Sequence, residues 1–283
     1  MRNGKPYELV ENVKECFCGG LSQSYGSTPK IKIYRCEDCK SLQAEFPNKA
    51  EGLPWEEDHT SSSYSAALRF RREEQVRQIV DAITTNNFKE PILDYGCGQG
   101  VFVNFATKSG LSTLGVDINP QFELSNIRRL NYAWEIPTGT WPSAVLLDVI
   151  EHHEAPVAFL RSLNANQLLL KVPSSEGPTA ILAKLFFRAK KPALLERLLL
   201  IDDPHPHYWL FSRKGLRLLG MKAGYSVKSK IRVTEFGREL PSRIRITDKH
   251  LRRLLVGLVG RVNEVTGKYW SDTIVFVFKL PDD

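Results

Sequence analysis

The sequence predicts an α/β protein with a doubly wound sheet, preceded by a small cysteine-rich unit. Apolar, strand-like segments alternate with helical segments between residues 91 and 172, which is typical of a parallel sheet covered by helices. The first strand–helix step passes through a glycine-rich turn at residues 96–100. Four of the five cysteines lie ahead of this alternation, within residues 16–39.

Composition places the chain among ordinary globular proteins. Its 283 residues are 42% hydrophobic and 25% charged, enough for one sizeable core and a small accessory unit. No apolar run approaches the roughly 20 residues of a membrane span, and residues 1–6 lack the apolar stretch of a signal peptide. We therefore expect a cytoplasmic protein without a transmembrane segment, and the oligomeric state stays open.

The cysteines form two close pairs, Cys16 with Cys18 and Cys36 with Cys39. Four thiolates can complete a tetrahedral zinc shell with no open position, which is typical of a structural site. Residues 1–50 have little core of their own, so a metal would supply much of their folding energy. We interpret them as a zinc ribbon or knuckle. Reactive thiols, or four cysteines that are simply buried, are the alternatives.

The rest of the chain is predicted in order. Residues 51–63 form a linker and residues 64–88 an amphipathic helix. Strands follow at 91–95, 112–117, 143–149 and 167–172, with helices at 101–108 and 155–164. The third strand is poorly marked. After a helical or loop stretch near 121–130, Tyr132–Ile136 is its only candidate.

An insertion at residues 174–206 follows the fifth strand, with helices predicted at Ala180–Arg188 and Pro192–Leu200. Ligands of open α/β sheets bind outside the carboxyl ends of the strands, where this insertion would lie. We interpret it as a substrate-binding cap, with a dimerisation arm or extra packing as the alternative. The remaining predictions are helices at 213–222 and 250–265 and strands at 225–236 and 273–280.

The glycine turn follows an acid at the strand end, Asp94, and a second acid, Asp117, ends the next strand about 20 residues later. Glycines at alternate positions let a backbone approach a ligand closely. An acid beside the turn disfavours a pyrophosphate, which prefers bare N–H groups, and suits an ammonium group. The second acid suits ribose hydroxyls. An ordinary turn is the alternative.

The spacing Asp-x-Gly-x-Gly-x-Gly resembles the first motif of class I S-adenosylmethionine-dependent methyltransferases. Residues 146–153 resemble that family's fourth strand and its exit, and His207–Ser212 resembles a His-x-x-x-Phe-Ser/Thr segment of small-molecule members such as ubiquinone-biosynthesis and sugar methyltransferases. The resemblance covers roughly residues 64–283. It implies a Rossmann-like sheet of about seven strands with an antiparallel last strand, and S-adenosylmethionine as the cofactor.

The resemblance also implies site residues. The expected donor-binding residues are Asp94, Tyr95, Gly96, Cys97, Gly98, Gly100, Asp117, Ile118 and Asp148. Among them, Asp94 would meet the ammonium group, Asp117 the ribose and Ile118 the adenine. His207 and His152 are the expected catalytic residues, because histidine is a natural base near neutral pH and a hydroxyl acceptor must lose a proton. Either histidine could instead be structural, with His152 capping the next helix.

Three functions fit these features. The first is methyl transfer to a small molecule, such as a sugar or quinone-type hydroxyl. Residues 174–283 carry 21 basic and 11 acidic side chains, which suits an anionic acceptor or only a solvated basic face. The second is RNA methylation, with the zinc ribbon and these cations contacting phosphates, although no basic-aromatic nucleic-acid motif is present. The third is a non-catalytic donor-binding module.

Overall fold

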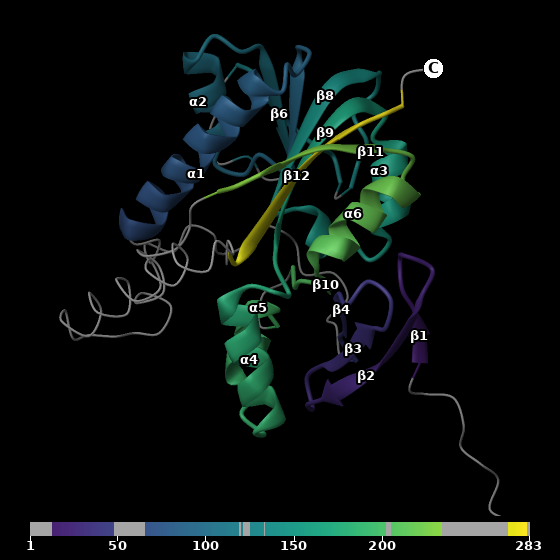
Figure 1. Ribbon diagram of the computed structural model, residues 1–283. Coiled ribbons are helices and arrows are strands. Elements are labelled where there is room, and N and C mark those ends of the chain that lie inside the picture. Colours follow the sequence, from purple (N-terminus) through teal and green to yellow (C-terminus); the bar gives the residue numbers. More distant parts are fainter. Residues whose placement is uncertain are drawn as a thin grey trace, which may run out of the picture.

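The computed structural model describes residues 13–47, 66–118, 120, 125–132, 134–201, 205–233 and 271–281, with residues 66–74 as backbone alone. It contains a seven-stranded sheet and a five-stranded sheet, and the smaller one lies beyond one edge of the larger (Figure 1). The predicted linker at 51–63 and the predicted helix at 250–265 lie outside the described residues.

The larger sheet has the order β11-β12-β9-β8-β5-β6-β7. Its strands are β5 (Ile92–Tyr95), β6 (Thr113–Asp117), β7 (Ile127–Arg129), β8 (Trp141–Leu147), β9 (Ala165–Pro173), β11 (Ser226–Ile231) and β12 (Thr273–Lys279). The strands β7, β6, β5, β8 and β9 pair in parallel, and β12 runs antiparallel to both of its neighbours. The expectation of a Rossmann-like sheet of seven strands with an antiparallel last strand is confirmed.

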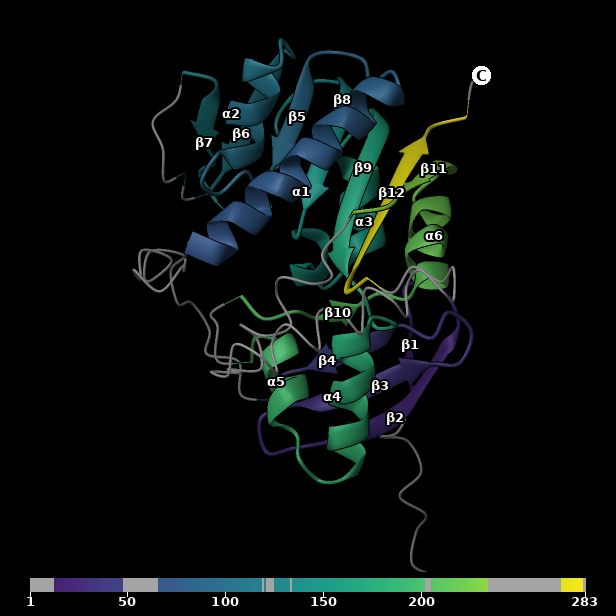
Figure 2. The ribbon, with the colours of Figure 1, turned by 60° about the vertical axis from the view of Figure 1, so that its left-hand side comes forward.

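Helices cover both faces of this sheet (Figure 2). They are α1 (Ala66–Thr85) and α2 (Val101–Lys108) on one face, and α3 (Pro156–Ser162) and α6 (Arg213–Lys222) on the other. Side chains alternate between the two faces along a strand. In β9, Leu168 and Leu170 pack with α3 and α6, whereas Leu169 packs with α1 and α2. The sheet is thus buried on both sides, as a continuous apolar strand requires.

The prediction for the third strand was wrong. The strand is β7, which pairs in parallel with β6, and it falls within the stretch expected to be helix or loop. Among the described residues of the expected strand 132–136, none is in a strand. β7 has three residues, none of them buried, at the edge of the sheet. An edge strand of this kind lacks the apolar pattern that marks buried strands.

The smaller sheet has the order β1-β2-β3-β4-β10, and all of its pairs are antiparallel. Its strands are β1 (Val13–Glu15), β2 (Leu21–Ser27), β3 (Lys32–Cys36), β4 (Leu42–Glu45) and β10 (Trp209–Leu210). The first four come from the N-terminal unit. The fifth comes from far along the chain and pairs Trp209 with Gln43 and Leu210 with Leu42.

Both helices predicted in the insertion are present, as α4 (Pro178–Arg188) and α5 (Ala193–Leu198), and they pack on the smaller sheet. Ile33 and Leu42 of the sheet, with Ile31 just before β3, form one buried cluster with Ala183 and Leu195 of the helices. We call β1–β4, β10, α4 and α5 together the ribbon lobe. Since β9 leads directly into α4, the ribbon lobe lies at the carboxyl edge of the parallel strands (Figures 1 and 2).

No helix in the described part of the chain combines the length and the apolar character needed to cross a membrane.

Candidate active site

The loop between β5 and α2 turns on three glycines in the left-handed region. Their φ angles are 73° at Gly96, 49° at Gly98 and 64° at Gly100, values that other residues rarely adopt. A Cβ on Gly96 would lie 2.6 Å from the side chain of Val149, whereas a Cβ on Gly98 would meet no atom within 4 Å. The loop is therefore packed at Gly96 and open at Gly98, where a ligand can approach the backbone.

Asp117 closes this loop from the neighbouring strand. The backbone N–H of Gly98 donates to Oδ2 of Asp117 at 2.7 Å. The parallel register of β5 and β6, which pairs Tyr95 with Val116, brings the two strand ends together. Ile118 follows directly, and its carbonyl oxygen accepts a hydrogen bond from Nε of Arg129 at 3.1 Å. The residues predicted to contact the ribose and the adenine, Asp117 and Ile118, thus lie beside the glycine loop.

Asp94 is a buried carboxyl at the same strand end, with 2% of its surface exposed. Burial, and then the charge of Asp117, raise its pKa from 3.8 to about 8. No hydrogen bond from the described residues offsets the burial of the carboxylate. A bound cation would favour the ionised form. The chemistry of this buried carboxyl therefore fits the ammonium group of an amino acid.

Tyr95 and Cys97 direct their side chains into the protein. The hydroxyl of Tyr95 donates to the carbonyl oxygen of Glu135 at 3.0 Å. The thiol of Cys97 packs so closely on β6 that a Cβ at Gly115 would lie 2.9 Å from its sulfur, and burial raises its pKa. These two predicted donor-binding residues would therefore contribute through their backbone.

Asp148 lies just beyond β8 in a left-handed conformation, with φ of 58°. Its carboxylate forms an ion pair with Nζ of Lys171 on β9. Only 6% of the lysine side chain is exposed, against 49% for Asp148. The ion pair holds the carboxylate of Asp148 at the carboxyl ends of the strands. The next residue, Val149, lies against Gly96 of the glycine loop.

The predicted histidines are brought together by the fold. His152 ends the 3₁₀ helix η1 (Ile150–His152), His207 precedes β10, and their ring centroids lie 4.6 Å apart. Burial, and then the charge of His152, lower the pKa of His207 to about 3. His207 is therefore neutral near pH 7 and, as a lone base, weak. Glu151 lies beside both rings, and burial followed by the charge of Asp148 raises its pKa well above the usual value.

The sequence prediction did not include Lys171 or assign a role to Glu151. Lys171 breaks the otherwise apolar run Leu168–Val172, and a single cation in a buried strand is the signal that identifies it. His153, the neighbour of His152 in the sequence, packs on Trp134, with ring centroids 4.6 Å apart.

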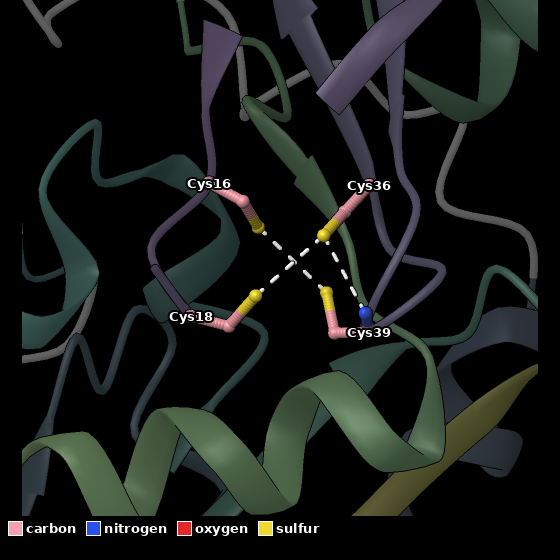
Figure 3. Close-up of side chains that lie close together, drawn as sticks. All are labelled: Cys16, Cys18, Cys36 and Cys39. Atoms are coloured by element: carbon pink, nitrogen blue, oxygen red, sulfur yellow. Dashed lines mark hydrogen bonds between the residues drawn. The ribbon is translucent and has the colours of Figure 1, made fainter. Parts of the chain in front are cut away.

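The four clustered cysteines converge on one point in the ribbon lobe (Figure 3). The sulfurs of Cys16 and Cys39 lie 3.7 Å apart, those of Cys18 and Cys36 lie 3.5 Å apart, and all four lie within 4.8 Å of one another. A tetrahedral zinc shell with Zn–S bonds of about 2.3 Å has sulfurs about 3.8 Å apart. Hydrogen bonding between Cys16 and Cys39 lowers the pKa of Cys39 and raises that of Cys16. The geometry fits a closed four-sulfur site.

The segment His207–Ser212 anchors this cluster to the larger sheet. The hydroxyl of Ser212 donates to the carbonyl oxygen of Cys39 and accepts the N–H of Gly215 at 2.8 Å, which caps α6. Phe17, between the first two cysteines, packs on Trp209 with ring centroids 4.9 Å apart. The same segment thus positions His207 and docks the ribbon.

Comparisons with known proteins place the chain in a family. A family model described as a methyltransferase domain matches residues 68–230. The crystal structure of magnesium protoporphyrin IX methyltransferase from Synechocystis PCC 6803 with bound SAH is similar, with 13% identity, coverage of 80% of this chain and 90% of that chain, and a TM-score of 0.50.

A second similar structure is the 1,6-didemethyltoxoflavin-N1-methyltransferase of Burkholderia thailandensis, with 14% identity, coverage of 91% of this chain and 98% of that chain, and a TM-score of 0.47. No curated protein sequence matches the chain. Because the family model spans more than half of the sequence, the chain belongs to the methyltransferase domain family and is a class I S-adenosylmethionine-dependent methyltransferase.

Proposed function

We propose that this enzyme methylates a hydroxyl of a small molecule, which binds between the carboxyl edge of the larger sheet and the ribbon lobe. The observation that carries the proposal is the ribbon lobe itself. The insertion and the N-terminal unit share one apolar cluster and lie where ligands of α/β sheets bind. A lobe at that edge suits an acceptor that must be enclosed and shielded from water.

On the donor side, the proposed contacts follow the geometry of the loop. Asp94 would hold the ammonium group of S-adenosylmethionine, and the open backbone at Gly98 would face its methionine half. Asp117 would accept hydrogen bonds from the ribose, and Ile118 would pack on the adenine. Asp148 would lie where donor and acceptor meet.

On the acceptor side, the reactive oxygen would face His152 and His207. Methyl transfer from a sulfonium needs alignment of the acceptor oxygen with the methyl carbon, and removal of the hydroxyl proton. The two imidazoles offer lone pairs that can accept a hydrogen bond from the hydroxyl and then its proton. The low pKa of His207 argues that it acts together with its neighbours instead of as an isolated base.

In the ribbon, Cys16, Cys18, Cys36 and Cys39 would hold one zinc ion. The sulfur separations close to about 3.8 Å support this assignment, and so does the absence of disulfides among these cysteines. The ion would supply folding energy to a unit that has a small core of its own.

A small acceptor is favoured over RNA because of how the ribbon is used. Its apolar face is covered by α4 and α5, and its cysteine end packs on Trp209 and Phe211. The faces of the ribbon that pack on these elements are not open to a nucleic acid. The excess of basic over acidic side chains in residues 174–283 suits an acidic group on the acceptor.

The test is to incubate the purified enzyme with cell-extract fractions and S-adenosylmethionine carrying a radiolabelled methyl group, before and after ribonuclease treatment. We expect label in ribonuclease-resistant small molecules. We expect His207→Ala to lose most of this labelling and to keep its affinity for S-adenosylhomocysteine. Label that disappears with ribonuclease, and whose transfer falls steeply with salt, would instead identify RNA as the acceptor.

A further inference from the structure

Glu151, His152 and His207 form a cluster outside the donor loop. One candidate ligand atom from each residue lies within 4.8 Å of the other two. The backbone N–H of Tyr208 donates to the carbonyl oxygen of Glu151 at 2.8 Å, which fixes the segment before β10 against η1. The cluster is therefore built by the fold and does not depend on flexible side chains meeting by chance.

Both imidazoles are oriented by backbone carbonyls. Nδ1 of His207 lies 2.7 Å from the oxygen of Leu198, and Nδ1 of His152 lies 3.2 Å from the oxygen of Pro206. A carbonyl oxygen can only accept, so each Nδ1 carries the proton and each Nε2 keeps a lone pair. Histidines that bind metals are held in this way, with one ring nitrogen donating to a carbonyl and the other bound to the ion.

The third member of the cluster is an unpartnered acid. Glu151 has 0% exposure, and neither carboxylate oxygen has a hydrogen-bond partner from another described residue. The nearby cation Lys171 is already paired with Asp148. A buried carboxylate without a partner is costly, and a cation bound directly to it offsets that cost.

We propose that Glu151, His152 and His207 bind a divalent transition-metal ion, with Zn²⁺ the closest match to the ligand set. Two imidazole nitrogens and one carboxylate oxygen are three ligands, which leave a tetrahedral position open. An ion at this position would draw the ligand atoms to about 3.4 Å from one another. Unlike the four-sulfur site, it has room for an outside oxygen. On the proposed function, that oxygen belongs to the acceptor, and the ion would lower the pKa of its hydroxyl in place of an unbound imidazole acting as the base.

The experiment measures metal binding without any acceptor. Elemental analysis of the freshly purified enzyme should give up to two metal ions per chain, one of them held by the cysteines. Co²⁺ titrated into the zinc-loaded enzyme should occupy the second site, or displace the ion bound there. It should give the weak absorption of cobalt with nitrogen and oxygen ligands, without the intense sulfur-to-cobalt bands. His207→Ala and Glu151→Gln should each weaken this binding by more than about 100-fold.

His153→Gln is the matched control, because this histidine neighbours the cluster in sequence and packs on Trp134 and Phe159 instead. Its Co²⁺ affinity should stay within about threefold of the parent. The proposal is overturned if the parent enzyme shows no second binding event at millimolar Co²⁺, or if binding persists in both ligand variants. Glu151→Gln keeps the size of the side chain, so it tests the site even where His207→Ala fails to fold. Failure here leaves the extract experiment untouched, so the two proposals can fail separately.

Discussion

The donor side and the acceptor side of this enzyme are built in different ways. The proposed donor side uses one continuous loop after β5 and the end of the adjacent strand β6, where the backbone of the loop meets the carboxylates of Asp94 and Asp117. The acceptor side joins η1, the segment before β10 and a ribbon lobe whose parts come from both halves of the chain. A motif within one short segment can be shared widely within a family, whereas a surface formed by distant segments can differ from one member to another.

The largest expected effect breaks the acceptor side and spares the donor side. Cys36→Ser should remove the zinc and loosen the ribbon lobe, because each sulfur is one of four ligands of a closed shell. Turnover should fall by more than about 100-fold, while the Kd of S-adenosylhomocysteine changes by less than about threefold. Elemental analysis, calorimetry and labelling of extract fractions measure the three quantities.

Cys97→Ser is the control for that variant, since this fifth cysteine lies in the donor loop and away from the four sulfurs. Its zinc content should match that of the parent. Unchanged zinc content in Cys36→Ser would rule out the four-sulfur site.

A smaller effect is expected from two alanine substitutions within the donor loop. Both glycines have positive φ, which costs an alanine about 1–2 kcal/mol. Gly96→Ala adds a collision with Val149, whereas Gly98→Ala meets open space. Calorimetry with S-adenosylhomocysteine should show a loss of more than tenfold for Gly96→Ala and of about fivefold for Gly98→Ala. Equal losses would mean that the packing against Val149 has no influence on the loop.

The pH dependence of donor affinity tests the electrostatics of the same side. In the donor-free protein Asp94 has a pKa of about 8, and the bound ammonium group requires its ionised form. Binding at pH 7 must therefore release a proton, and affinity should rise from pH 6 to about 8, above which the ligand's own amino group loses its charge. Calorimetry in two buffers of different ionisation enthalpy measures the released proton. Asp94→Asn should abolish both the release and the slope.

The same group sets a stability trend of opposite sign. A carboxyl whose pKa is raised on folding binds more protons in the folded state, so stability falls as pH rises from about 4 to about 8. Saturating S-adenosylhomocysteine should reduce this fall. Thermal unfolding of the parent and of Asp94→Asn, without and with the ligand, separates this contribution from the opposite one of His207 below about pH 6.5. A stability difference between the two donor-free proteins that does not change with pH would contradict the assignment.

The smallest expected effect concerns the ion pair between the two sides. Asp148→Ala leaves the buried Lys171 without its carboxylate, whereas Lys171→Met leaves a half-exposed carboxylate in contact with water. We expect Asp148→Ala to lower the free energy of unfolding by about 1–2 kcal/mol and Lys171→Met to change it by less than about 1 kcal/mol. Urea denaturation measures both. A greater loss in Lys171→Met than in Asp148→Ala would show that the lysine itself stabilises the edge, and that leaving it buried without its carboxylate costs little.

Much of the fold could be predicted because its signals are local. The alternation of apolar segments predicted the sheet and its helices, and the spacing around Asp94 predicted the donor loop. β7 was missed because an exposed edge strand needs no apolar pattern. The close pairing of the four cysteines could be anticipated from their spacing, although their metal is still a prediction.

Long-range contacts were harder to predict. No local pattern indicates that Leu210 pairs with Leu42, or that α4 packs on the N-terminal sheet. The meeting of Glu151 with His207 depends on those contacts, so the sequence showed the histidines as separate candidates. Only the assembled lobe makes them neighbours.

The most direct test of this division is calorimetric titration of S-adenosylhomocysteine into Asp117→Ala and His207→Ala side by side. We expect Asp117→Ala to weaken binding by more than about tenfold, because it loses charge-assisted hydrogen bonds at the loop, and His207→Ala to bind like the parent. Parent-like affinity in Asp117→Ala, or an equal loss in His207→Ala, would contradict it.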